Sequence, residues 1–528
     1  RNAKLCVPSD FNFGFDVVDE YARLCPEKRA LVWCNQKGEE KVITFGEMKE
    51  LSLKMCNVIS SYGVKKGDFV MSMLNRRWEY WVLVVACCKM GVVLIPATHM
   101  LTPKDVAYRV NEAGVKLLFA TEEEDVAEHI SLALPDCKNL KGVLSVNGAH
   151  FDNLDEKLEN APAEFSFDAR PNPRDLMLVY FTSGTTGMPK MVMHDFLYPL
   201  GHVFTAKYWQ DVVDDGLHFT MAETGWAKCS WGKIYGQWIS GTAVFAYDYH
   251  GRFTPTDVLP LVKKYGITTF CAPPTIYRFL VKEDLSSFDL SSIKHCSTAG
   301  ESLNPEVFKQ FEKATGLKIY EGFGQTEGTV MLGTFKYLSP VTGSLGKPSP
   351  LYDVRLIDDD ENEVKPGEEG EIAILKSENQ CGLVAGYFKD EARTAALKND
   401  VYFHTGDLAY QDKDGWFWYV GRKDDIIKSS GYRIGPFEVE SALMEHPAVL
   451  ECAITAVPDD LRGQIVKATI VLTKNYQPSD ELVKELQNHV KKVTAPYKYP
   501  RIVEFVKELP KTTSGKIRRV EIRENDKK

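Results

Sequence analysis

Helix and strand patterns alternate along most of the first 340 residues. Residues 43–63 carry apolar side chains at helical spacing and end at Gly63, and residues 68–74 then have the pattern of a strand. Residues 78–91 read as a buried helix that ends at Gly91, and residues 92–97 as the next strand. Because strands joined through helices run parallel, this alternation predicts an α/β architecture with largely parallel sheets.

The pattern changes after about residue 340. Residues 352–375 read as antiparallel strands joined by acidic turns, and residues 414–436 as a hairpin-like strand pair followed by a charged joint. From residue 435 onward, short helices and strands alternate. We therefore predict an N-terminal domain over residues 1–423 and a small α+β domain over residues 424–528, with the boundary within Lys423–Asp425.

Composition excludes several classes of protein. The net charge of the 528 residues is −9, whereas a nucleic-acid-binding protein is more often basic. The twelve cysteines form no CxxC pair, and several lie in apolar runs, which is typical of a reducing compartment. The longest apolar stretch, Trp81–Cys88, is far shorter than the ~20 residues of a membrane span. We expect a cytoplasmic protein, or one of the mitochondrial matrix if a leader has been removed before Arg1.

A loop rich in glycine and hydroxyl residues follows a predicted strand at residues 176–181. The stretch YFTSGTTGMPKMV, residues 180–192, contains Ser183, Gly184 and Thr185 and ends near Lys190. Glycines allow successive backbone N–H groups to converge on an anion, and hydroxyls and a lysine add hydrogen bonds and charge. The spacing differs from that of the common phosphate loop, because a proline precedes Lys190 and a methionine follows it.

Four further stretches carry polar groups suited to a nucleotide. YEGFGQTEG (320–328) contains Glu327, a hard oxygen ligand for Mg²⁺. YFHTGD (402–407) ends in Asp407, whose carboxylate could accept from two ribose hydroxyls. Residues 421–436 carry two arginines and a flexible Ser-Ser-Gly segment, and PKTTSGKIRR (510–519) places Lys516 in a mobile-looking tail.

These five stretches, in this order along the whole chain, resemble the acyl- and aryl-CoA synthetases of the adenylate-forming superfamily. AETGWAKCSWG (222–232) and SSGYRIGPFEVE (429–440) look most like the medium-chain acyl-CoA synthetases. The resemblance implies a β-barrel-like subdomain within the N-terminal domain and a mobile C-terminal domain. It also implies two half-reactions: a carboxylate attacks the α-phosphorus of ATP, and the thiol of coenzyme A then attacks the acyl-adenylate.

The resemblance further assigns residues to ATP and to catalysis. Lys516, Glu327, Thr326 and Gly431 are expected to be catalytic, with Glu327 also holding Mg²⁺, and Asp424 is expected to be the hinge. The ATP and AMP contacts are expected to be Thr182, Ser183, Gly184, Thr185, Thr186, Gly187, Lys190, Gly300, Glu301, Ser302, Tyr320, Glu321, Gly322, Phe323, Gly324, Gln325, Asp407, Arg422 and Arg433.

The acid and coenzyme A are assigned less directly. The expected acyl-pocket residues are Trp209, Trp226, Lys228, Trp231, Cys271, Gly322 and Gly324; the alternative is that Trp226 and Trp231 are core packing and that Lys228 points to water. The expected coenzyme A contacts are Ser430, Gly431, Tyr432, Arg462, Lys498 and Arg501, although the last three could be ordinary surface charges. We expect His194, His202 and His404 to be structural, since an ionised carboxylate needs no base.

These observations predict an AMP-forming acyl-CoA synthetase for short- and medium-chain, including branched, acids. Its expected partners are the carboxylic acid, ATP with Mg²⁺, and coenzyme A, with no nucleic acid and no membrane span; a homodimer stays open. An aryl-acid ligase is the alternative within the superfamily, and a luciferase-like oxygenase fits less well. A non-catalytic nucleotide or acyl-CoA sensor is the alternative from another class of protein. The presence of Lys516, Glu327 and Asp407 argues against a sensor.

Overall fold

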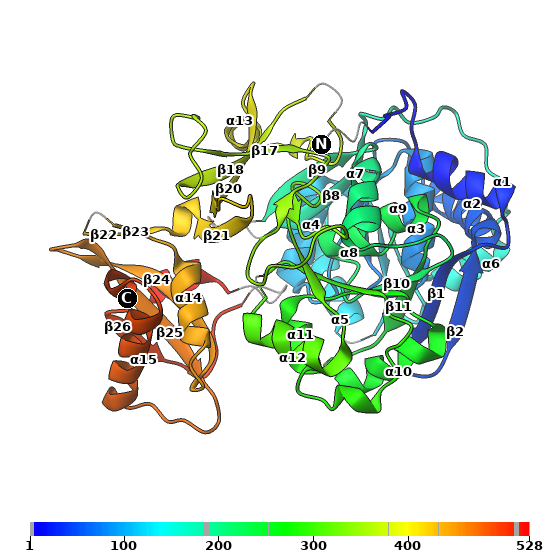
Figure 1. Ribbon diagram of the computed structural model, residues 1–528. Helices are drawn as coiled ribbons and strands as arrows, with labels where there is room; N and C mark the ends of the chain where they lie inside the picture. Colours follow the sequence, from blue (N-terminus) through cyan, green and yellow to red (C-terminus); the bar gives the residue numbers. More distant parts are fainter. Residues whose placement is uncertain are drawn as a thin grey trace. The chain divides into compact units, whose positions relative to one another are not determined.

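The computed structural model describes residues 5–123, 125–182, 189–251, 253–301, 303–377, 380–430, 432–511 and 517–526. The described chain divides into two compact units, whose elements are labelled in Figure 1. Unit 1 extends to residue 353 and also takes residues 376–397. Unit 2 takes residues 354–375 and the described chain from residue 398 onward.

Unit 1 contains a nine-stranded sheet whose middle strands β14, β13, β12, β10, β11 and β1 run parallel. Antiparallel strands continue it at both edges. In spatial order its strands are β16 (Lys347–Pro348), β15 (Leu332–Gly333), β14 (Ile319–Phe323), β13 (His295–Ala299), β12 (Thr269–Cys271), β10 (Leu217–Thr220), β11 (Ala243–Asp248), β1 (Arg29–Asn35) and β2 (Glu40–Thr44).

Unit 1 also contains an eight-stranded sheet. Its strands from β8 to β7 are parallel, and β9 and β19 are antiparallel additions at one edge. In spatial order they are β19 (Gly386–Tyr387), β9 (Lys190–Asp195), β8 (Leu176–Thr182), β4 (Val93–Pro96), β3 (Phe69–Met73), β5 (Val115–Ala120), β6 (Gly142–Ser145) and β7 (Asp152–Asn153). The two sheets confirm the predicted α/β architecture with largely parallel strands.

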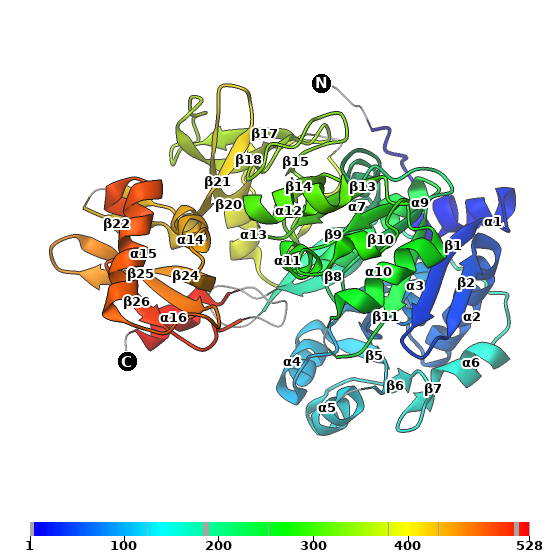
Figure 2. The ribbon, with the colours of Figure 1, turned by 60° about the horizontal axis from the view of Figure 1, so that its bottom comes forward.

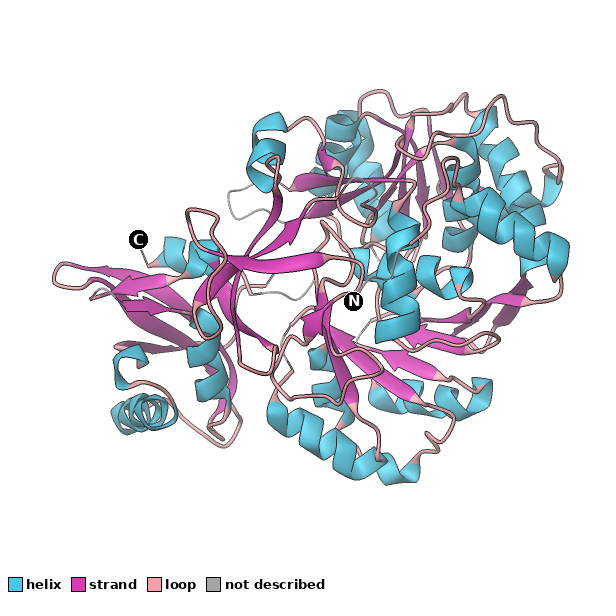
Figure 3. Ribbon diagram, turned by 45° about the horizontal axis from the view of Figure 1, so that its top comes forward, coloured by secondary structure: helices cyan, strands magenta, loops and turns pink. Residues whose placement is uncertain are grey.

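Helices pack against both sheets of unit 1 (Figure 3). The helix predicted near residues 43–63 begins after Thr44, whose hydroxyl accepts from the backbone of Glu47 while the Glu47 side chain accepts from the backbone of Thr44. The next helix ends at Gly91, which has a φ of 67°. The helices of unit 1 are α1 (Glu20–Leu24), α2 (Phe45–Ser61), α3 (Glu79–Met90), α4 (Pro103–Ala113), α5 (Val126–Ala133), α6 (Leu154–Asn160), α7 (Tyr198–Phe204), α8 (Ala227–Gly232), α9 (Tyr235–Ile239), α10 (Pro255–Tyr265), α11 (Pro274–Leu280), α12 (Pro305–Thr315) and α13 (Glu391–Leu397).

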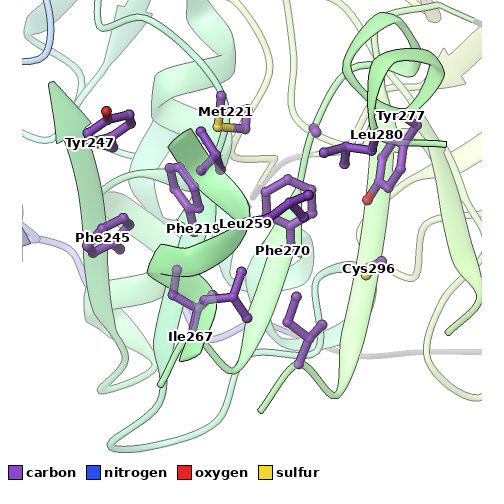
Figure 4. Packing of buried hydrophobic residues seen from close by; sticks show 14 of the residues in the cluster. Phe219, Met221, Phe245, Tyr247, Leu259, Ile267, Phe270, Tyr277, Leu280 and Cys296 are labelled. Carbon is purple, nitrogen blue, oxygen red and sulfur yellow. The ribbon is translucent and has the colours of Figure 1, made fainter. Parts of the chain in front are cut away.

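The core beside the nine-stranded sheet forms where α10, α11 and α12 cover one of its faces (Figure 2). Phe219, Phe245 and Phe270 come from neighbouring strands and meet Leu259 of α10 and Tyr277 of α11 (Figure 4). Burial of these side chains removes apolar surface from water, which stabilises the sheet by about 25 cal/mol per Å². The packed core therefore supports the carboxyl ends of β12 and β13, where the predicted site residues Cys271 and Gly300 lie.

Unit 2, in its described residues, contains two smaller sheets and three α-helices. The four-stranded sheet has the order β17 (Asp353–Ile357), β18 (Glu369–Leu375), β20 (Tyr402–Gln411) and β21 (Phe417–Arg422). The other sheet has the order β23 (Tyr432–Ile434), β22 (Ile427–Ser429), β25 (Gly463–Leu472) and β24 (Val449–Asp459), with β26 (Ile502–Phe505) parallel to β25. The helices are α14 (Pro436–Met444), α15 (Asp480–Val493) and α16 (Arg519–Asn525).

The strand pairing around the expected hinge differs from the prediction. Strand β21 pairs with the preceding β20, and the short hairpin of β22 and β23 comes after the charged turn Lys423–Asp425 rather than before it. The alternation of apolar and polar residues within residues 414–436 indicates strands, but it does not determine which neighbouring strand each one pairs with. The compact units also group residues 354–375 with the C-terminal part of the chain, and the domain boundary at residue 424 stays a prediction.

Candidate active site

The turn after β14 carries the predicted metal-binding carboxylate. Glu327 is half-buried, and its Oε1 accepts a hydrogen bond of 2.8 Å from the hydroxyl of Tyr387. The backbone carbonyl of Glu327 accepts from the N–H of Val384 at 2.7 Å. Both contacts come from the segment around β19, so the carboxylate is oriented by a strand sixty residues further along the chain.

The predicted phosphate loop connects two adjacent antiparallel strands. Thr182 at the end of β8 is paired with Lys190 at the start of β9. The ammonium group of Lys190 lies 5.1 Å from the ring centroid of Tyr387, a cation–π distance. Tyr387 thus contacts Lys190 with its ring and Glu327 with its hydroxyl, which brings a cation and a carboxylate to one small region of unit 1.

His194 of β9 is buried beside the predicted catalytic Thr326. Its Nε2 lies 2.8 Å from the backbone carbonyl of Thr326, and because a carbonyl only accepts, Nε2 carries the proton. Burial lowers the pKa of this imidazole to about 4, so the ring is neutral at pH 7. The arrangement fits the structural role expected for His194, which fixes the backbone at Thr326.

The other two histidines are also held by neighbouring side chains. His202 is fully buried, and its burial holds the pKa of the ring well below the usual value. His404 lies between Glu371 and Glu361, at 3.5 and 3.4 Å, and the pKa of its ring is raised chiefly by a hydrogen bond to Glu371.

The predicted adenine wall joins β13 and β14. The ring of Tyr320 lies 4.0 Å from that of His295, and Gly300 has a φ of 104°, a conformation that favours glycine. Glu301 is exposed and accepts from Thr275 at 3.3 Å. Glu321 is buried and accepts from the backbone N–H groups of Leu303 and Gly343 at 3.2 and 3.3 Å. Burial raises the pKa of Glu321 to about 7.

Most of the predicted acyl-pocket residues meet in one cluster. The rings of Trp209 and Trp231 make an edge-to-face contact with centroids 6.0 Å apart, and Cys271 belongs to the same buried group. A Cβ at Gly322 would lie 2.5 Å from the indole of Trp209, and one at Gly324 would lie 2.4 Å from that of Trp231. The two glycines are therefore required by the close approach of the indoles.

Lys228 and Trp226 flank this cluster on α8. The ammonium group of Lys228 donates to the carbonyl of Ala299 at 2.9 Å and would lie 2.6 Å from a Cβ at Gly300. Trp226 is half-buried and immediately precedes α8. Lys228 consequently points along the carboxyl end of β13 rather than into bulk water.

Unit 2 brings together the two residues predicted to bind ribose. Asp407 of β20 is paired with Arg422 of β21, and Arg422 Nη1 donates to Asp407 Oδ2 at 3.3 Å. The hydroxyl of Tyr419 donates to the other carboxylate oxygen at 2.9 Å. The Asp407 side chain is only 6% exposed whereas that of Arg422 is 37% exposed, so the carboxylate is fixed from two sides.

Ion pairs surround the expected hinge and the expected coenzyme A contacts. Lys423 pairs with Asp359 and Glu371 at 2.8 and 3.2 Å, and Arg523 pairs with Asp425 at 2.7 Å. The remaining expected contacts also have local partners: Arg433 with Asp359, Arg462 with Asp459, Lys498 with Glu438, Arg501 with Tyr499, and Tyr432 with the ring of Tyr497. Ser430 has a φ of 50°, a conformation unusual for a residue other than glycine.

Several predicted residues lie outside the described residues. They are Ser183, Gly184, Thr185, Thr186, Gly187, Ser302, Gly431 and Lys516. Their roles stay predictions.

Two tyrosines that contact the predicted carboxylates were missed from the sequence. Tyr387 is far from Glu327 in the chain, whereas Tyr419 is close to Asp407. Neither tyrosine stands in a glycine-rich or charged motif. Strand alternation would not have found Tyr419, because it lies three residues before Arg422 and would face the opposite side of a regular strand. The register shift between Leu408 and Ala409 in the β20–β21 pair brings it to the side of Asp407. Tyr387 has no local signal either, since β19, which carries it, pairs with β9, almost two hundred residues earlier in the chain.

The described residues include no helix long and apolar enough to cross a bilayer.

Comparison with known proteins gives two matches to family models. The model described as AMP-binding enzyme matches residues 18–388, and that of the AMP-binding enzyme C-terminal domain matches residues 438–516. The mitochondrial acyl-coenzyme A synthetase ACSM3 of Mus musculus is 42% identical over 540 residues, which covers 100% of this chain and 92% of that protein.

Solved structures are similar over nearly the whole chain. The anthranilate CoA ligase AuaEII in complex with anthranoyl-AMP has a TM-score of 0.89 at 26% identity, covering 99% of this chain and 98% of that one. The acyl-CoA synthetase of Brucella canis has a TM-score of 0.73 at 29% identity, covering 99% and 96%.

Proposed function

The chain belongs to the family of AMP-binding enzymes and is an AMP-forming acyl-CoA synthetase, and we propose that it acts on short- and medium-chain carboxylic acids, including branched ones. The acid is first joined to AMP with release of pyrophosphate. The acyl group then passes to the thiol of coenzyme A, with release of AMP and a proton.

One observation carries this conclusion. The 42% identity to an acyl-coenzyme A synthetase extends over 100% of the chain, so the likeness includes the C-terminal region as well as the nucleotide-binding motifs. A carboxylate resists attack because of its charge and resonance, and joining it to AMP supplies a good leaving group. No serine or cysteine nucleophile is needed for that chemistry.

A magnesium ion fits beside Glu327. Mg²⁺ prefers hard oxygen ligands and commonly binds through one or two carboxylates together with substrate phosphates. The bond from Tyr387 occupies Glu327 Oε1, and no described residue donates to its Oε2. When bound, the ion would screen the repulsion between the acid and the phosphates of ATP.

We assign the β- and γ-phosphates to the loop between Thr182 and Lys190. The pairing of Thr182 with Lys190 across β8 and β9 supports this assignment, because it holds the two residues that bound the loop side by side, one of them a lysine. Thr326 is assigned to the α-phosphate, and its backbone is fixed by the neutral ring of His194. Lys516 is assigned to the acid and the α-phosphate, where its charge would oppose the negative charge that develops.

Asp407 is assigned to the ribose hydroxyls. An ionised carboxylate that is already oriented can accept two hydroxyl hydrogens without first losing side-chain freedom. The contacts from Arg422 and Tyr419 provide that orientation. Arg422, Arg433 and the residues Gly300 to Ser302 and Tyr320 to Gln325 complete the proposed nucleotide contacts.

We propose that the small C-terminal domain turns about Asp424 between the two half-reactions. Lys516 is needed for adenylation and would then obstruct the thiol. Withdrawing it would bring Ser430, Gly431 and Tyr432 to the pantetheine chain, where a glycine leaves room for a narrow thiol arm. Arg462, Lys498 and Arg501 are proposed to meet the phosphates of coenzyme A.

The proposed acid preference rests on the tryptophan cluster. Trp209 and Trp231 fill the space above Gly322 and Gly324, and bulky indoles should limit the length of acid admitted. Flat indole faces would also suit an aromatic acid, and the similarity to an anthranilate CoA ligase favours that as the second candidate.

The reaction is tested by measuring pyrophosphate release with ATP, Mg²⁺ and a panel of acids from acetate to decanoate with branched and aromatic members. We expect release and AMP formation with aliphatic acids of short to medium length. Strict dependence on aromatic acids would replace the aliphatic assignment, and nucleotide binding without release for any acid would favour a sensor.

We also propose a cellular compartment for the protein. Relatives such as ACSM3 of Mus musculus are described as mitochondrial, and we propose the mitochondrial matrix ahead of the cytoplasm. Fractionation of cells that express the tagged natural protein would distinguish the two, and light scattering of the purified protein would test for a homodimer.

A further inference from the structure

A second group of ionisable side chains lies where the two large sheets of unit 1 approach each other. Glu123 follows β5 of the eight-stranded sheet, while Asp248 ends β11 of the nine-stranded sheet and His250 follows it. One ligand atom from each of the three residues lies within 4.8 Å of the others. None of them belongs to the residues assigned to ATP, the acid or coenzyme A.

Asp248 is buried with part of its carboxylate unsatisfied. The residue is 1% exposed, and its Oδ1 has no hydrogen-bond partner among the described residues. That oxygen lies 3.8 Å from Nε2 of His250, and the same nitrogen lies 2.5 Å from Oε2 of Glu123. A buried carboxylate oxygen without a donor costs free energy, and burial raises the pKa of Asp248 accordingly.

The cations near this group are either shared with other carboxylates or exposed to water. Arg77 lies 3.8 Å from Asp248, but its guanidinium pairs more closely with the fully buried Glu79, at 3.0 Å. Lys37 approaches Glu123 at 3.8 Å with a side chain that is 71% exposed, so water weakens its contribution. In the ion pairs of the described residues, Glu79, Glu123 and Asp248 are near one buried guanidinium, one solvated ammonium and the imidazole. Arg76 is a further cation that lowers the pKa of Asp248.

Strand pairing and hydrogen bonds hold the backbone of Asp248 and His250. Asn35 of β1 is paired with Asp248, the N–H of Gln36 donates to the Asp248 carbonyl at 3.2 Å, and the N–H of His250 donates to the Gln36 side chain at 3.0 Å. The backbone of Asp248, at the end of β11, and that of His250, which follows it, are thus held by hydrogen bonds before any ion arrives.

We propose that Glu123, Asp248 and His250 bind a divalent transition-metal ion that links the two sheets of unit 1. An imidazole with two carboxylates is a ligand set suited to Zn²⁺, Co²⁺ or Mn²⁺, whereas Mg²⁺ and Ca²⁺ prefer oxygen alone. Ligand bonds of about 2 Å would require small shifts of the Glu123 and His250 side chains. Both are about a quarter exposed and can move, while Asp248 stays fixed.

The ion would place positive charge beside the carboxylates of Glu123 and Asp248 and would give Asp248 Oδ1 a partner. Because its ligands come from two sheets, binding to the folded state would stabilise their association. The site is structural in this proposal and takes no part in acyl transfer.

Co²⁺ is the probe for the test because its visible absorption reports on its ligands. The purified full-length protein is treated with a chelator, dialysed against Co²⁺ without nucleotide, and measured for absorption and for bound metal per chain. We expect a single tightly bound Co²⁺, displaced by Zn²⁺, and a higher melting temperature with either ion. His250→Ala and, separately, Glu123→Gln should lose the bound ion and the thermal shift.

His150→Ala is the matched control. His150 pairs with a single carboxylate, Glu122, and is 64% exposed, so its loss should leave Co²⁺ binding intact. The exposed cysteines Cys6 and Cys25 are common to all variants and cannot explain a difference between them. The proposal is overturned if the natural protein binds no Co²⁺, or if His250→Ala, folded by circular dichroism, binds it as well as His150→Ala does.

Discussion

Asp407 allows the proposed contact with the ribose of ATP to be tested at a single side chain. Its carboxylate accepts from Tyr419 and Arg422 in the β20–β21 hairpin. If it also accepts from the ribose, Asp407→Asn should raise KM for ATP roughly ten- to a hundredfold, because a hydrogen bond to a charged group contributes about 1.5–3 kcal/mol. Steady-state kinetics with varied ATP measures this.

Asp412→Asn is the control for that prediction. Asp412 lies in the same hairpin and accepts from Trp418 at 2.9 Å and from the backbone of Trp416 at 2.9 Å. Its substitution should lower stability and leave KM for ATP unchanged. Equal effects of the two substitutions would contradict the ribose assignment.

Tyr387 is expected to act through Glu327. Tyr387→Phe removes the hydrogen bond to the carboxylate and retains the ring beneath Lys190. The Mg²⁺ concentration for half-maximal adenylation should rise roughly tenfold, the usual cost of losing a group that orients a metal ligand. Tyr352→Phe, which instead loses a buried bond of 2.7 Å to Thr329, should leave the Mg²⁺ requirement unchanged; a shift in both variants would argue for general loosening.

Glu321 predicts a pH dependence of stability. Burial raises the pKa of its carboxyl from 4.5 to about 7, so the folded state holds the proton more tightly than the unfolded state. The stability due to this group is present below pH 4.5 and is lost as the pH rises to about 7, by about 3 kcal/mol in total.

Urea unfolding at several pH values would measure that loss. Glu321→Gln cannot titrate and should remove the slope between pH 4.5 and 7, whatever its effect on absolute stability. Glu301→Gln, at a nearby exposed carboxylate, should retain the slope. An unchanged slope in Glu321→Gln would show that other groups cause it.

At the scale of elements, the indole of Trp231 in α8 packs closely against Gly324, which directly follows β14. Trp231→Ala should admit longer acids, with a gain in kcat/KM of about fourfold for each added methylene that becomes buried. It should also cost about 3–5 kcal/mol of stability, since a large side chain is lost from a packed cluster. The acid panel run on the variant measures the first effect and thermal unfolding the second.

Trp238→Ala separates the two effects. Trp238 is fully buried, packs on Phe13 and Phe45, and donates to the carbonyl of Ala30 at 2.9 Å, away from the cluster of Trp209 and Trp231. It should lose comparable stability without a change of acid preference. If Trp231→Ala also leaves the preference unchanged, Trp231 is core packing only.

At the scale of the whole molecule, the proposed alternation separates the two half-reactions. Lys516→Ala should abolish adenylation yet spare thioester formation from supplied acyl-AMP, because its charge acts only in the first step. Gly431→Leu should do the reverse by blocking the thiol's path. Separate assays of adenylation and of thioester formation measure these effects. A similar loss of rate in both half-reactions, in either variant, would contradict the alternation.

The sequence alone determined the architecture of unit 1 and the order of its motifs. Local signals are strong there: apolar periodicity defines α2, and a continuous apolar run that ends at a glycine defines the buried α3. Glycines such as Gly91 end helices because they adopt a positive φ at little cost. The motif residues likewise follow strands, so their position at strand ends could be inferred from local patterns.

Only the tertiary structure decided which distant residues meet. Tyr387 reaches Glu327 through the pairing of β19 with β9, β21 turns back to β20, and Glu123 approaches His250 across two sheets. The apolar pattern within each of these segments would be the same whichever partner the segment contacts. Periodicity and turn chemistry act over a few residues, whereas strand pairing and sheet packing depend on burial summed over the whole unit, and for that reason the partners could not be derived from the sequence.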